Sequence, residues 1–201
     1  PAELYTHDFD GNGTVEQIIS CYTEDGKAYP MVLKHDLQKQ IPVIKKRYLK
    51  YADYAGKQMQ DIFSPEERKD AVVKKVVNPN TSLLLNEGNF RFSLKALPVE
   101  AQFSPVFGID TLDYDRDGKL DILLAGNFFD VLPEMGRYDA NYGLILRGKG
   151  QGEFEAIQSK DSGFFTKGQV RKVRQIKGAN HQTLVILAKN NDQVQVFSYQ
   201  K

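Results

Sequence analysis

Cysteine is nearly absent from this chain of 201 residues, which contains only Cys21. A single cysteine excludes an internal disulfide framework and any cysteine-rich zinc site. Cys21 lies in the apolar run 18–22, so we expect it to be a small buried core residue rather than a reactive thiol.

Long apolar runs are missing as well. No run approaches the ~20 residues that a helix needs to span a bilayer, so the sequence predicts no transmembrane segment. The first residues also lack the basic stretch followed by an apolar one that marks a secretion signal. Because the chain starts abruptly on a strand-like segment, we expect an excised or mature piece whose targeting signal lies outside it.

An excess of one charge is also absent. The chain has 27 basic and 26 acidic side chains and a formal net charge of +1. No overall field would hold it to nucleic acid or to an anionic membrane, so we predict no nucleic-acid partner. With 26% charged and 41% hydrophobic residues, the composition is that of an ordinary folded protein and not of a disordered one.

The chain does contain a repeated acidic segment. Residues 8–19 read Asp-Phe-Asp-Gly-Asn-Gly-Thr-Val-Glu-Gln-Ile-Ile, and residues 113–124 read Asp-Tyr-Asp-Arg-Asp-Gly-Lys-Leu-Asp-Ile-Leu-Leu. In each copy an acidic loop runs directly into an apolar strand. The matching spacing predicts that the two segments fold alike.

Oxygen ligands at alternate positions of a tight turn can surround one hard cation. Calcium suits this spacing best, because it takes about six to eight oxygen ligands at flexible geometry, whereas magnesium prefers about six and retains water. We therefore predict two Ca²⁺ sites. The predicted ligands of the first are the side chains of Asp8, Asp10, Asn12 and Glu16 and the carbonyl of Thr14. Those of the second are the side chains of Asp113, Asp115, Asp117 and Asp121 and the carbonyl of Lys119.

An EF-hand opens with the same acidic spacing, but it needs a bidentate Glu at the twelfth position and a helix on each side. The twelfth positions here are Ile19 and Leu124, both inside expected strands, so we reject an EF-hand. The alternative that stays open is a pair of Asp- and Gly-rich β-turns without metal. A buried carboxylate cluster without a cation would, however, repel itself.

Strand-like runs surround the acidic segments at regular spacing. The second segment lies in a unit over residues 104–158, with expected strands at 107–112, 122–125, 142–146 and 153–157. The first lies in a similar unit, residues 1–35 plus 80–98, with expected strands at 4–6, 17–22, 82–85 and 90–94. A third, incomplete unit over residues 168–201 has expected strands at 169–176, 183–188 and 194–199. The loop 177–181 of this third unit carries no carboxylate, so we predict that it binds no metal.

Residues 36–79 differ from the strand units and predict a helical insertion. Apolar side chains recur at three- and four-residue spacing from Ile41 to Ala55, as in an amphipathic helix. Residues 64–67, Ser-Pro-Glu-Glu, combine a capping Ser, a Pro at the first helical position and a Glu three residues after the cap. They predict a second helix that runs to Val76.

Residues 108–127, Gly-Ile-Asp-Thr-Leu-Asp-Tyr-Asp-Arg-Asp-Gly-Lys-Leu-Asp-Ile-Leu-Leu-Ala-Gly-Asn, resemble the first half of a blade in the FG-GAP or VCBS repeats of integrin-like β-propellers. Blades of that family carry a calcium loop of this form between their first two strands. With segments 136–140 and 188–192, the chain is similar to the C-terminal part of large secreted bacterial VCBS-repeat proteins.

The resemblance implies a mainly β fold, a partial β-propeller of about three four-stranded antiparallel blades with an α-helical insertion, in a single repeat domain over residues 1–201. Three blades do not close a ring, so the remaining blades would belong to a larger parent chain. The resemblance also implies an extracellular or cell-envelope setting, with a protein or a glycan as the partner.

We expect a non-catalytic recognition or scaffold module. One alternative is part of a propeller-fold carbohydrate-active hydrolase or lyase, which would need a convergent set of acid, base or nucleophile. His7, His35 and His181 show no metal or triad spacing. The carboxylates that could pair near the second loop are Asp110, Asp130, Glu134 and Asp139.

A further alternative is a partner-dependent assembly piece. Tyr48, Tyr51 and Tyr54 could anchor a second protein from the helical insertion. Aromatic residues at helical spacing more often pack on the core of their own domain, and that is the simpler interpretation.

Overall fold

The computed structural model describes residues 2–179 and 182–199. The chain divides into two compact units, residues 1–79 and 80–201. Over the described residues the strands form four antiparallel sheets, none of them closed, so the prediction of a mainly β chain is confirmed. The arrangement of these sheets as propeller blades stays a prediction.

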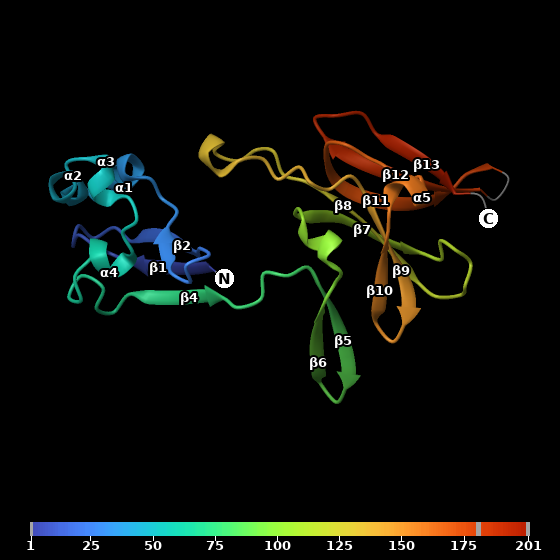
Figure 1. The fold of residues 1–201 in the computed structure, drawn as a ribbon, viewed down its shortest axis with the longest axis horizontal. Coiled ribbons are helices and arrows are strands. Elements are labelled where there is room, and N and C mark those ends of the chain that lie inside the picture. Colours follow the sequence, from blue (N-terminus) through green and yellow to red (C-terminus); the bar gives the residue numbers. More distant parts are fainter. Residues whose placement is uncertain (1, 180–181, 200–201) are drawn as a thin grey trace. The chain divides into compact units, whose positions relative to one another are not determined.

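The first unit contains a sheet in the strand order β3-β2-β1-β4 (Figure 1). The expected strands at 4–6 and 17–22 are confirmed, and they pair from Ala2 opposite Cys21 to His7 opposite Glu16. The strands are β1 Ala2–His7, β2 Glu16–Tyr22, β3 Ala28–Pro30 and β4 Val72–Val76.

Side chains of β2 alternate between the two faces of this sheet. Ile18 and Ser20 are buried on the face that meets the core, whereas Ile19 is 50% exposed on the other. Cys21 shares the outer face with Ile19 and is only partly buried, with its Sγ 3.0 Å from the Sδ of Met31. The expectation that Cys21 is a buried core residue is therefore wrong.

Short helices follow β3 and share one hydrophobic core with the sheet. The predicted helix from Ile41 to Ala55 is divided, because Tyr48 leaves helical geometry at φ −122° and ψ 95°. Its apolar spacing still places Ile41, Ile44 and Tyr48 in the core. The helices are α1 Lys34–Gln40, α2 Val43–Arg47, α3 Tyr51–Tyr54 and α4 Met59–Ile62.

Two tyrosines of this region form hydrogen bonds within the first unit. The hydroxyl of Tyr48 donates to the carbonyl of Asp61 at 2.9 Å, and that of Tyr54 donates to the carbonyl of Val32 at 2.9 Å. Tyr51 is 63% exposed. Two of the three residues considered as a docking anchor therefore fasten the helices to their own backbone.

The predicted second helix over residues 64–76 is wrong. The capping signal does form, since the Ser64 N–H donates to Glu67 at 2.8 Å and the Glu67 N–H donates to Ser64 Oγ at 3.2 Å. The chain then turns at Asp70, whose φ of 67° is left-handed and ends any helix. The β-branched residues beyond it pair with β1 as strand β4, where valine is favoured.

The second unit contains a sheet in the order β10-β9-β8-β7. All four strands expected in residues 104–158 are confirmed (Figure 1). They are β7 Val106–Leu112, β8 Asp121–Gly126, β9 Leu144–Gly150 and β10 Glu153–Ile157.

A second sheet of this unit has the order β11-β12-β13 and confirms the three strands expected near the C-terminus. They are β11 Gln169–Lys177, β12 Thr183–Asn190 and β13 Gln195–Tyr199. The two sheets share a core in which Leu123 and Ile145 cluster with Val173 and Val185. Their approach is so close that a Cβ at Gly108 would lie 2.7 Å from Cγ2 of Val173.

The hairpin predicted at 82–94 forms, but it does not join the first sheet. Strands β5 Ser82–Gly88 and β6 Arg91–Ala96 pair with each other as a separate sheet in the second unit, and β3 and β4 complete the first sheet instead of the hairpin. The polar links of Thr81 to Gln102 hold the base of the hairpin within this unit.

The remaining described elements are the 3₁₀ helices η1 Val99–Gln102 and η2 Pro133–Met135 and the helix α5 Ser159–Ser162. Among the described residues, no helix has the length and apolar character to cross a membrane.

A buried carboxylate braces the first sheet. Glu3 is 4% exposed and accepts hydrogen bonds from the hydroxyls of Tyr5 and Tyr22, each at 2.7 Å, while Lys75 Nζ lies 2.6 Å away. The Lys75 ammonium, followed by the Tyr5 hydroxyl, lowers the pKa of Glu3 from its ordinary 4.5 to about 2. These contacts join β1, β2 and β4.

We predict that Glu3→Gln destabilises the protein by about 1 to 3 kcal/mol at neutral pH, since it removes hydrogen bonds to a charged group. The folded state lowers this pKa, so the stabilisation is complete above pH 4.5 and is lost as the pH falls toward about 2. Urea unfolding followed by circular dichroism at a series of pH values measures both effects.

Glu24→Gln is the matched control, because Glu24 lies exposed in the turn between β2 and β3. It should keep the wild-type stability and pH dependence. Equal unfolding midpoints for Glu3→Gln and the control at neutral pH would contradict the bracing role of Glu3.

Candidate metal sites

Each acidic segment forms the loop between the first two strands of a sheet. The first loop joins β1 to β2, and the second joins β7 to β8. An aromatic residue anchors each loop at its second position. Phe9 is 2% exposed and stacks on Phe63 with ring centroids 4.4 Å apart, and Tyr114 packs against the core between the sheets of the second unit.

Four equivalent hydrogen bonds fold the two loops in the same way. Each runs from a backbone N–H to a side-chain oxygen of the loop or of the strand after it. In the first loop they are Asn12 to Asp10 (3.3 Å), Gly13 to Asp8 (2.8 Å), Thr14 to Asn12 (2.7 Å) and Phe9 to Glu16 (2.9 Å). In the second they are Asp117 to Asp115 (3.3 Å), Gly118 to Asp113 (3.1 Å), Lys119 to Asp117 (2.8 Å) and Tyr114 to Asp121 (2.6 Å).

The backbone conformation agrees as well. Gly13 and Gly118 have φ values of 86° and 82°, which favour glycine. Gly11 and Arg116, two residues earlier in each loop, have φ values of 71° and 64°. The expectation that the two segments fold alike is thereby confirmed for their loops.

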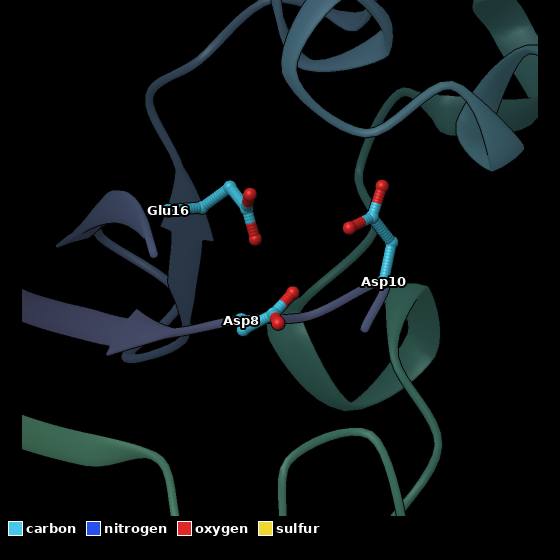
Figure 2. A group of neighbouring side chains, drawn as sticks. All are labelled: Asp8, Asp10 and Glu16. Atoms are coloured by element: carbon cyan, nitrogen blue, oxygen red, sulfur yellow. The ribbon is translucent and has the colours of Figure 1, made fainter. Parts of the chain in front are cut away.

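The carboxylates of the first loop converge. Asp8, Asp10 and Glu16 each offer an oxygen within 4.8 Å of the others. Figure 2 shows the three carboxylates pointing toward a common space, Glu16 from β2 and the two aspartates from the loop. The pKa of Asp8 lies below its ordinary value, mainly because the Gly13 N–H donates a hydrogen bond to the Asp8 carboxylate. This hydrogen bond favours the ionised carboxylate. Such a set of oxygen donors could hold a metal ion.

The second loop gathers Asp113, Asp115 and Asp117 in the same way, with one oxygen of each within 4.8 Å of the others. Basic side chains lie against this cluster. Lys119 Nζ is 2.7 Å from Asp117, and Arg147 Nη1 is 3.5 Å from Asp115. The Lys119 ammonium is the main cause of the lowered pKa of Asp117. The cluster could hold a metal ion, but the ion would compete with these two cationic groups.

The ninth position distinguishes the loops. Glu16 belongs to the first cluster, whereas Asp121 is not among the three clustered residues of the second. Asp121 is 0% exposed, and its two oxygens accept the N–H groups of Tyr114 at 2.6 Å and Gly148 at 2.7 Å. It therefore joins the loop to both β8 and β9.

The other predicted ligands lie in the same loops. The Asn12 side chain accepts the Thr14 N–H, and its role as a ligand stays a prediction, as do those of Asp121 and of the carbonyls of Thr14 and Lys119. Sequence reasoning missed Arg147, because β9 brings it to Asp115 from a distant part of the chain. The basic residues at alternate positions of β9 were the only sequence signal for it.

His7 and His35 lie outside both clusters. His7 packs edge-on against Phe9 with ring centroids 5.5 Å apart, and His35 lies 3.1 Å from Asp36. His181 falls outside the described residues.

The carboxylates considered for an enzyme come from different segments. Asp110 lies in β7, Asp130 accepts a hydrogen bond from Asn190 at 3.4 Å, and Asp139 is exposed in the connection between β8 and β9. The side chain of Glu134 lies outside the described part of the chain.

Comparisons of the chain with protein-family models, with curated proteins and with solved structures found no match.

We predict that Asp121→Ala destabilises the protein by about 2 to 4 kcal/mol even in the presence of a chelator, because the buried N–H of Gly148 and the part-buried N–H of Tyr114 lose their acceptor. Asp117→Ala is the matched control. Its carboxylate is exposed, so its removal should cost less than about 1 kcal/mol. Urea unfolding in chelator compares the two, and equal unfolding midpoints would show that Asp121 has no structural role of its own.

Proposed function

We propose that this chain is a calcium-binding β-repeat module with a recognition or scaffold role, of the FG-GAP or VCBS type. The observation that carries the proposal is the repetition of one loop in two sheets. Four equivalent hydrogen bonds, the same left-handed positions and an acidic cluster recur at the same place between two antiparallel strands.

The choice of calcium follows from the donor atoms. Both clusters offer carboxylate oxygens, and neither contains a cysteine or histidine that would favour zinc. A loop that supplies further carbonyl and amide oxygens suits the larger, more flexible coordination shell of calcium better than the strict octahedron of magnesium.

The ion would act on the fold and would not take part in a reaction. Bound between the first two strands of a sheet, it would offset the mutual repulsion of three carboxylates and fix the loop to the strand. In the first loop Glu16 would connect the ion directly to β2. In the second, Asp121 already ties the loop to the sheet, and the ion would add to that link.

The setting and partners are part of the same proposal. Calcium is abundant outside cells, so an extracellular or cell-envelope module with a protein or glycan partner fits calcium sites of this kind. The exposed connections at the ends of the sheets, on a scaffold fixed by the loops, would supply the recognition surface.

We predict that the wild-type chain binds two calcium ions in an isothermal titration. A ligand bound only by the native state stabilises it by about 2.7 kcal/mol at a hundredfold excess over its dissociation constant, so calcium should raise the melting temperature. Asp10→Ala and Asp115→Ala should each remove one site, and the double variant should remove both together with the thermal shift.

Asp25→Ala is the matched control. Asp25 also accepts hydrogen bonds in a connection between strands, from Thr23, Lys27 and Tyr29, but it lies outside both clusters. It should keep two sites. If wild-type protein gives no calcium-specific heat or thermal shift, the loops are metal-free turns and the proposal is refuted.

A further inference from the structure

The second unit contains a groove that no residue of the acidic loop lines. Its volume is about 290 Å³. One wall comes from η1 and the residue after it, and the other from residues 140–144, which lead into β9, and from residues 156–159 at and beyond the end of β10. The residues that matter for its chemistry are Glu100, Phe103, Tyr142, Gln158 and Ser159.

The first wall is held in place by buried contacts. Ala101 of η1 is 1% exposed within a core shared with Leu124 and Leu146. The side chain of Gln102 donates to the carbonyls of Thr81 and Leu97, each at 3.0 Å. Glu100 and Phe103 therefore project from a backbone that is fixed on both sides.

One aromatic ring of the groove, that of Tyr142, is positioned by a stacking contact. Tyr142 stacks on Phe165 with an angle of 3° between the rings and 5.6 Å between their centroids. Tyr142 is nonetheless 47% exposed and Phe103 56% exposed. An aromatic ring such as that of Tyr142, held by packing and still open to solvent, loses less freedom when a ligand binds.

Three polar side chains of the groove are free to bind a ligand. Among the described residues, the carboxylate of Glu100, the amide of Gln158 and the hydroxyl of Tyr142 have no hydrogen-bond or ion-pair partner. Gln158 precedes α5, but its side chain does not cap that helix. The groove thus combines aromatic faces with donors and acceptors that have no partner in the fold.

We propose that this groove binds a short neutral glycan, with the rings of Phe103 and Tyr142 against the C–H faces of the sugar and with Glu100 and Gln158 on its hydroxyls. This inference deepens the proposed recognition role and rests on it. A pyranose ring matches these aromatic side chains, because one of its faces carries C–H groups that the negative face of an aromatic ring attracts.

Charge and size select this class of ligand. Among the described residues that line the groove, Glu100 alone carries a charge, so a uronic or sialic acid would be repelled. The volume lies at the lower end of small-ligand pockets, which suits one to about three sugar rings and not a folded protein element.

The test is a titration of the isotope-labelled 201-residue chain with cellotriose, mannotriose, maltotriose and chitotriose, followed by nuclear magnetic resonance. At least one neutral trisaccharide should shift the amide signals of the groove at millimolar concentration. Tyr142→Ala and Phe103→Ala should each weaken that binding by about tenfold, the value of one aromatic contact. Trigalacturonic acid should not bind.

Phe90→Ala is the matched control for Phe103→Ala. Phe90 is 99% exposed at the turn of the β5–β6 hairpin and does not line the groove, so its removal should leave sugar binding unchanged. Calcium titration of the same samples separates the two proposals and also reports whether each variant is folded.

Calcium binding without any neutral trisaccharide bound would overturn the groove proposal and leave the calcium module standing. Sugar binding that survives in both Tyr142→Ala and Phe103→Ala would also overturn it. A proline hexamer that shifts the groove signals while no sugar does would assign the groove to peptides instead.

Discussion

The backbone N–H at the second position of each acidic loop donates to a carboxylate at the start of the following strand, and the rest of each loop depends on this bond. It ties Phe9 to Glu16 and Tyr114 to Asp121. This bond closes each loop onto the following strand, β2 or β8. The carboxylates of the aspartates in the loop then lie close together. The aromatic residue that carries the N–H packs on the core, so the loop cannot move away from the sheet without exposing a ring.

The two loops differ in the basic side chains that lie near their clustered carboxylates. The first brings three carboxylates together without a lysine or arginine in ion-pair contact with any of them among the described residues. The second has Lys119 and Arg147 against its aspartates, and its ninth carboxylate is used by two backbone donors. Equal ligand spacing therefore does not imply equal calcium affinity, because in the second loop the ion must replace favourable contacts that already exist.

Two of the predictions that failed, the second helix and the place of the hairpin, concern which strands complete the first sheet. Residues 64–67 carry a correct capping signal, and its hydrogen bonds form, but the valines after Asp70 find an open strand edge on β1 and become β4. The hairpin at 82–94 was then left to pair with itself. Local sequence describes what a segment favours in isolation, whereas the available partner decides which of two acceptable structures forms.

The sequence by itself determined the acidic loops and the strands around them. Loop folding depends on Asp, Asn and Gly at fixed offsets and on hydrogen bonds within a few residues, and strand 2-periodicity is equally local. The tertiary structure alone decided which strands complete the first sheet, that Asp121 ties β8 to β9, that Arg147 reaches Asp115, and that η1 and the residues before β9 line one groove. Each of these features joins residues that are far apart in the chain. The conformational preference of a short segment does not determine which remote segment it will contact.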